Sequence, residues 1–78
     1  MKHELKTWPN YFEAIKAGDK TFEIRNNSDR GFQKGDRIHF REYDIRLGYC
    51  GGELFGTITY VTNFEQPAGQ IVFSFELD

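Results

Sequence analysis

The sequence has a single cysteine, Cys50, and only two histidines. One cysteine cannot form an intramolecular disulfide, and without a Cys/His cluster there is no basis for a structural zinc site. No apolar run approaches the length of a membrane span, and residues 1–4 lack the apolar core of a signal peptide. We therefore expect a soluble, cytoplasmic monomer that has no cofactor, no bound metal and no contact with a membrane.

Basic residues are missing from the second half of the chain. All ten Lys and Arg lie in residues 1–46, whereas residues 47–78 carry four acidic residues and no basic one. The net charge of the whole chain is −2, which argues against a protein that coats DNA or RNA through its phosphates. A small basic surface on the first half remains compatible with this distribution.

The length of 78 residues corresponds to one domain, residues 1–78, and eight Phe, four Tyr and one Trp supply large apolar side chains for its core. A helix is expected over residues 9–17, capped by Thr7 or Asn10 and ended by Gly18. Its apolar residues recur at three- and four-residue steps and form one stripe: Trp8, Tyr11, Phe12 and Ile15.

Most of the remaining chain has the period-two pattern of strands. The expected strands are residues 3–7, 21–25, 37–43, 55 or 57 to 63, and 71–77. Between them we expect a loop over 26–34 pinned by Phe32, a glycine-containing loop over 44–52, and a turn at 67–69. Five short strands without helical crossovers favour an antiparallel, partly closed barrel.

The stretch from Gly18 to Arg25 has two contrasting faces. As a strand, it places Phe22 and Ile24 on one side, which we expect to be buried. Thr21, Glu23 and Arg25 then occupy the other side, facing solvent or a ligand, and Lys20 stands where the chain enters the strand.

The spacing G-x-K-x-x-E-x-R in this stretch resembles the signature of the ASCH domain, which is related to the PUA RNA-binding domains. Further segments fall where a short ASCH-like family of bacteria and phages has them: residues 5–9, Tyr11-Phe12, Ala14-Ile15, Phe32, Gly35-Asp36, Arg41-Glu42-Tyr43 and Gly48-Tyr49. The resemblance implies a mainly β (α+β) fold, a PUA-like barrel of about five strands with one N-terminal helix packed over one opening.

The resemblance also favours a polar cleft beside this strand, binding RNA or a nucleotide-like ligand. Lys20 and Arg25 would hold a phosphate or a base carbonyl, and Glu23 would accept from an amino group. Arg41, Tyr43 and Tyr49 are further candidates, because a guanidinium forks to oxygens and a tyrosine ring stacks on bases. The alternative is that these residues form internal ion pairs and half-buried packing that only support the fold.

Two other functions remain open. Some ASCH-fold proteins are amidohydrolases acting on acetylated cytidine, and Lys20 matches their lysine. Glu23 stands where they have a threonine, so an enzyme of this kind would need Glu23 as general base. The third alternative is a protein-interaction module, which exposed apolar side chains at Phe55, Tyr60 and Phe64 would favour.

Overall fold

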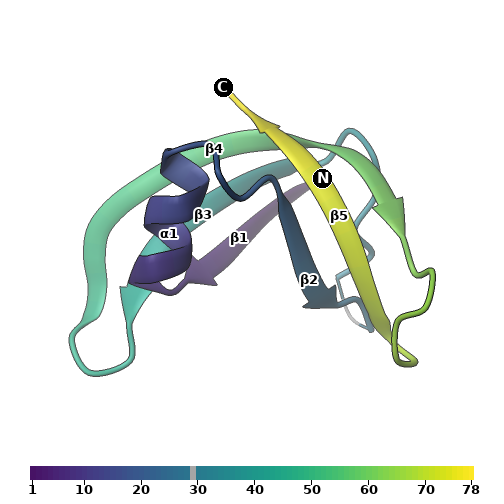
Figure 1. Ribbon diagram of the computed structural model, residues 1–78, viewed down its shortest axis with the longest axis horizontal. Coiled ribbons are helices and arrows are strands. Elements are labelled where there is room, and N and C mark those ends of the chain that lie inside the picture. Colours follow the sequence, from purple (N-terminus) through teal and green to yellow (C-terminus); the bar gives the residue numbers. More distant parts are fainter. Residues whose placement is uncertain (29) are drawn as a thin grey trace.

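One strongly curled sheet and a short helix make up the fold in the computed structural model, which describes residues 1–28 and 30–78 (Figure 1). Residue 29, inside the predicted loop 26–34, lies outside the described residues. The elements are β1 (Lys2–Thr7), α1 (Pro9–Lys16), β2 (Phe22–Asn26), β3 (Arg37–Asp44), β4 (Gly48–Thr62) and β5 (Gln70–Leu77). The expected mainly β fold, a barrel-like sheet of five strands with one N-terminal helix, is confirmed.

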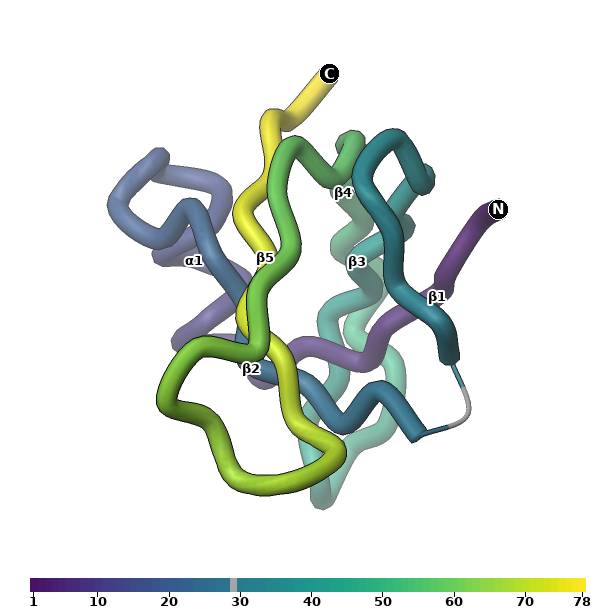
Figure 2. Tube along the Cα trace, turned by 90° about the vertical axis from the view of Figure 1, so that its right-hand side faces the viewer, coloured from purple at the N-terminus to yellow at the C-terminus, as the bar shows by residue number. Residues whose placement is uncertain are grey.

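The five strands lie in the order β1-β3-β4-β5-β2, so that β1 and β2 are the two edges. Three of the four pairings are antiparallel, as predicted, but β1 runs parallel to β3. The sheet curls into a half-barrel whose edges face one another without pairing (Figure 1). In Figure 2 residues 30–36 rise past β1 to the start of β3.

The concave face of the sheet holds the core. The predicted inward residues of the third strand, Ile38 and Phe40, are 1% and 0% exposed, and Phe32 is buried as expected. The alternation of β5 is confirmed as well. The buried apolar residues are Leu5, Phe12, Ile15, Phe32, Ile38, Phe40, Ile58, Ile71, Phe73 and Phe75.

The helix forms almost where it was predicted and ends at a glycine with positive φ, Gly18. The predicted caps are wrong: Trp8 is the N-cap and makes no side-chain capping bond, while the Thr7 hydroxyl donates to Leu5 O at 3.3 Å. Because Trp8 has extended backbone (ψ 146°), helical periodicity does not describe its direction. Trp8 is therefore 44% exposed rather than part of a buried stripe. Tyr11 is 48% exposed as well, although it lies within the helix.

The segment predicted as a loop over residues 44–52 instead contains the turn of the β3–β4 hairpin and the first residues of β4. Only residues 45–47 turn, and β4 runs for 15 residues from Gly48. The glycines misled the prediction because they weaken strands in general. In this hairpin Gly52 permits close packing of the helix on the sheet, since a Cβ at this position would lie 2.9 Å from the ring of Phe12.

Candidate functional site

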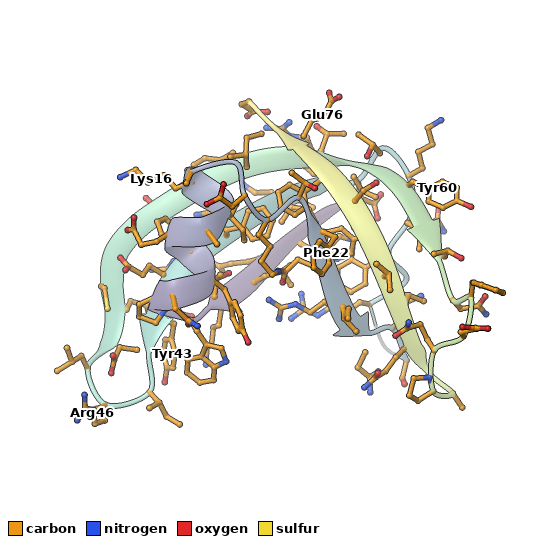
Figure 3. The ribbon with its side chains drawn as sticks, in the orientation of Figure 1. Lys16, Phe22, Tyr43, Arg46, Tyr60 and Glu76 are labelled. Carbon is orange, nitrogen blue, oxygen red and sulfur yellow. The ribbon has the colours of Figure 1, made fainter. Side chains whose placement is uncertain are left out.

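A cleft of about 630 Å³ opens where the two unpaired sheet edges meet the beginning of α1. Tyr43, near the lower end of α1, and Phe22, on β2, border it from two sides (Figure 3). Its lining residues come from β1, α1, β2, β3 and the segments between them: Lys6, Thr7, Trp8, Tyr11, Lys20, Phe22, Glu23, Ile24, Arg25 and Tyr43.

The two faces of β2 are reversed relative to the prediction. Glu23 is only 4% exposed, whereas Phe22 and Ile24 are 45% and 53% exposed. The register explains the reversal, because Glu23 lies opposite the core residue Phe73 of β5 and therefore points to the concave face. At this edge the concave face lies beside the gap between β1 and β2, where the Glu23 carboxylate has hydrogen-bond partners.

Those partners are the two cations of the same stretch. Lys20 Nζ donates to Glu23 Oε2. Arg25 donates from Nε and from Nη2 to Glu23 Oε1, at 3.0 and 2.8 Å. A buried carboxylate is tolerable when it is paired and hydrogen-bonded, so the cluster satisfies Glu23 at both oxygens. The spacing Lys-x-x-Glu-x-Arg thus joins three side chains, as the sequence pattern predicts.

The same cations also connect the cluster to backbone at the sheet edges. Lys20 Nζ donates to Phe22 O at 2.7 Å, and Arg25 Nη2 donates to Lys6 O of β1 at 3.1 Å. Arg30 Nη1, beyond β2, donates to Glu4 O at 3.2 Å. Two arginines therefore bridge the seam between β1 and the chain of β2 without any backbone pairing.

The cations keep hydrogen-bonding capacity that the cluster does not use. An arginine has five N–H donors and a lysine has three. In the part of the chain that the structure describes, Arg25 Nη1 has no hydrogen-bond partner, and Lys20 Nζ makes two of its three bonds. Their side chains are 27% and 17% exposed, so a ligand in the cleft can reach these donors.

Aromatic rings form much of the cleft wall. Lys20 Nζ lies 5.4 Å from the ring centroid of Tyr11 and 5.0 Å from that of Phe22. On the other side, the rings of Trp8 and Tyr43 are 6.2 Å apart, and Lys6 Nζ lies 4.6 Å from the Tyr43 centroid. Cations within about 6 Å of a ring face are attracted to it, so the rings and charges hold one another in place.

Arg41 and Tyr49, the other predicted binding residues, do not line this cleft. Arg41 stacks on Tyr49, with Cζ 3.8 Å from the ring centroid, and its Nη1 donates to Glu4 Oε1 at 3.0 Å. Tyr49 is the cross-strand partner of Tyr43, and the two ring centroids are 5.2 Å apart. The pair is thus next to the cleft and separated from it by Tyr43.

Several lining residues were missed from the sequence, above all Trp8 and Tyr11. Both were assigned to the buried stripe of the helix because the spacing fits. For Trp8, Pro9 was the available signal: it begins the helix, so the residue before it takes extended backbone and leaves the stripe. Nothing in the sequence could reveal that Lys6 would join them, because this depends on where β1 sits in the sheet.

The residues named for a protein-interaction surface do not form one patch. Phe55, Tyr60 and Phe64 are 40%, 63% and 73% exposed. Phe55 and Tyr60, however, are five residues apart along β4, which corresponds to roughly 16 Å. Phe55 also stacks on His39, with the ring centroids 4.4 Å apart.

The described part of the chain has neither a clustered metal centre nor a membrane-spanning helix. Within residues 1–28 and 30–78, no group of three or more His, Cys, Asp or Glu side chains is arranged to hold a metal ion. The eight-residue α1 is the longest helix there, and no helix in those ranges has the length and apolar character to cross a bilayer.

Comparison with known protein families matches residues 2–75 to the family described as Domain of unknown function (DUF3850). The match begins with the first residue of β1 and reaches into β5, so it includes every element that lines the cleft. A comparison with curated proteins gives no match.

Proposed function

This chain belongs to the DUF3850 family, and we propose that its cleft binds an unpaired nucleotide, either free or within a single-stranded RNA. One observation carries the proposal: the cleft of this net-acidic chain is lined by three cations, Lys6, Lys20 and Arg25, and by one acid, Glu23, between aromatic walls. The volume of about 630 Å³ lies within the range of small-molecule sites.

Each part of a nucleotide has a partner in this cleft. An unpaired base can stack on the exposed rings of Trp8 and Tyr11, as bases do in single-strand RNA sites. The remaining donors of Lys20 and Arg25 suit a phosphate oxygen or a base carbonyl, with the charge-assisted bonds that anions favour. Glu23 then serves to orient the two cations, because both of its oxygens already accept from them.

We also propose that the fold is an ASCH/PUA-like barrel. The half-barrel of five strands, with one helix beside the open edges, supports this proposal together with the G-x-K-x-x-E-x-R spacing. The amidohydrolase alternative has less support. It needs Glu23 as a general base within reach of substrate, and this side chain is 4% exposed with both oxygens engaged by cations.

The test is a titration of the protein with the four nucleoside 5′-monophosphates and with short single-stranded RNAs. Trp8 is the only tryptophan and lines the cleft, so its fluorescence and its indole NMR signal report binding there. We expect Lys20→Ala and Arg25→Ala to weaken binding at least tenfold, because hydrogen bonds from charged groups are lost. Duplex RNA should bind more weakly than single strands, since its bases are not available for stacking.

Matched controls remove the same charge elsewhere. Lys16 and Arg46 are exposed and point away from the cleft (Figure 3), so Lys16→Ala and Arg46→Ala should bind like wild type. The proposal fails if no nucleotide or RNA shifts the Trp8 signal at millimolar concentration. It also fails if folded Lys20→Ala and Arg25→Ala bind as tightly as the two controls.

A further inference from the structure

The stacked pair Arg41 and Tyr49 extends the ring surface of the cleft along the β3–β4 hairpin. Tyr43 belongs to both parts, because its ring lies 6.2 Å from Trp8 in the cleft and 5.2 Å from Tyr49 outside it. Tyr49 is 46% exposed, and the Arg41 side chain is 33% exposed. Three rings and one guanidinium thus follow one another from the cleft to the surface.

We infer that this surface is a second nucleotide position, so that the ligand is single-stranded RNA of at least two nucleotides rather than a free mononucleotide. The inference rests on the proposed function and names its ligand class more narrowly. One base occupies the cleft, and the next stacks on the Arg41–Tyr49 pair. Successive bases on successive rings are the common arrangement in single-strand binding, and an arginine plane stacks bases as a ring does.

The charged side chains differ between the two positions, so the two positions suit different parts of the ligand. At the outer position Glu4 Oε1 accepts from Arg41 Nη1 at 3.0 Å, so a carboxylate offsets part of the charge of the guanidinium. This place suits an uncharged base better than a phosphate. Lys6 is opposite Arg41 in the β1–β3 register, and its Nζ lies 4.6 Å from the Tyr43 centroid. Lys6 therefore stands between the two positions, where the phosphate that links two nucleotides would pass.

The experiment compares each nucleoside 5′-monophosphate (pN) with the dinucleotide of the same base that keeps the 5′-phosphate (pNpN). Indole and amide NMR signals of Trp8 and Tyr49 report the two positions separately. We expect pNpN to bind wild type at least fivefold more tightly than pN, which corresponds to one additional stacked base. Only the dinucleotide should shift the Tyr49 signal strongly.

Variants then test which residues provide this gain. Tyr49→Ala and Arg41→Ala should each bring the ratio of the pNpN and pN affinities close to one, while Tyr49→Phe should preserve it because the ring remains. Tyr60→Ala is the matched control, since Tyr60 is an exposed tyrosine of the same strand whose neighbour in the sheet is Ser74 of β5. If either Tyr49→Ala or Arg41→Ala folds poorly, the other variant still tests the inference.

The outcomes separate this inference from the proposed function. If pN binds in the cleft and pNpN binds no more tightly, the second position does not exist while the proposed function stands. The same conclusion follows if folded Tyr49→Ala or Arg41→Ala keeps the full gain of wild type. If neither pN nor pNpN shifts the Trp8 signal, both proposals fall together.

Discussion

Within residues 1–28 and 30–78, two acidic side chains are buried, Glu23 and Asp36, and each buried charge is compensated in a different way. Glu23 is 4% exposed and is neutralised by two long, flexible cationic side chains beside an open cleft. Asp36 is 8% exposed, and its Oδ2 lies 2.8 Å from His3 Nε2 and accepts from Gln33 N at 3.0 Å. Its Oδ1 accepts from the N-terminal ammonium at 3.1 Å.

Both carboxylate oxygens of Asp36 already have partners, so little hydrogen-bonding capacity is left for a ligand. His3 is itself 3% exposed, and the Phe32 ring covers it with a centroid distance of 4.4 Å. Burial by itself raises the pKa of Asp36, but the hydrogen bonds with His3, the N-terminal ammonium and Gln33 N outweigh it and bring that pKa below its ordinary value. Asp36 thus ties β1 to the start of β3.

The contrast shows that a buried carboxylate does not by itself mark a functional site. What distinguishes Glu23 is that its cations reach it from the side of the cleft and retain unused donors there. Asp36 instead takes its partners from the buried His3 ring, a backbone N–H and the exposed N-terminal ammonium, none of which lines the cleft. Substitutions at Glu23, Asp36 and Arg30 sharpen this comparison, and their expected effects on stability decrease in that order.

Glu23→Gln should have the largest effect on stability. It leaves Lys20 and Arg25 without their counter-charge, and breaking one side of a buried ion cluster costs about 3 kcal/mol in the free energy of unfolding. Urea unfolding followed by Trp8 fluorescence measures this loss. Glu76→Gln, at an exposed position of β5 (Figure 3), should stay within about 0.5 kcal/mol of wild type. Equal losses in the two variants would mean that Glu23 is no more than a surface acid.

Asp36→Asn should lower the free energy of unfolding by about 2 kcal/mol at pH 7, because charged hydrogen bonds are lost in a buried place. A carboxylate whose folded pKa is depressed contributes stability above its unfolded pKa of 3.8, and this contribution disappears as the pH falls through the folded pKa. The difference between wild type and Asp36→Asn should therefore be full at neutral pH and shrink below about pH 3.8.

Urea unfolding of both proteins between pH 7 and pH 2.5 checks this dependence. Asp19→Asn is the matched control, because Asp19 is exposed and its side chain makes no hydrogen bond within the described residues. A constant difference across the whole range would contradict the role given to the Asp36 charge. Nucleotide binding should survive Asp36→Asn in the folded protein, since Asp36 does not line the cleft.

Arg30→Ala should have the smallest effect. Its bond to Glu4 O spans the seam, as the bond from Arg25 to Lys6 O does, but Arg30 is exposed and pairs with no buried acid among the described residues. We expect a change of at most about 0.5 kcal/mol in the free energy of unfolding, measured beside wild type in urea. A loss as large as that of Glu23→Gln would mean that the seam, rather than the buried cluster, stabilises this side of the sheet.

The sequence alone predicts those parts of the fold where one face is clearly apolar. The alternation of residues 71–77 and the pair Ile38 and Phe40 were identified correctly because each strand is covered on its apolar face. The spacing also predicted that Lys20, Glu23 and Arg25 would meet. It could not predict which face of β2 lies inside, because that depends on β2 being an edge strand above a seam.

Other errors have the same origin in tertiary structure. β4 continues through Gly51 and Gly52, and at Gly52 a side chain would collide with Phe12 of the helix, a contact that only the tertiary structure reveals. The parallel pairing of β1 with β3 joins segments that are 35 residues apart, and no local pattern encodes such a contact. The aromatic walls of the cleft follow from these arrangements, so they could not be predicted from the periodicity of the sequence either.

The strand order has a consequence for how the protein folds. The two edge strands, β1 and β2, are the first two along the chain, and each pairs with a strand that comes later. The hairpins β3–β4 and β4–β5 are local and can form early, whereas β2 must wait for β5, about 48 residues further on. Lys20, Glu23 and Arg25 are neighbours in sequence, yet we expect their cluster to assemble against the core only after β2 has paired with β5.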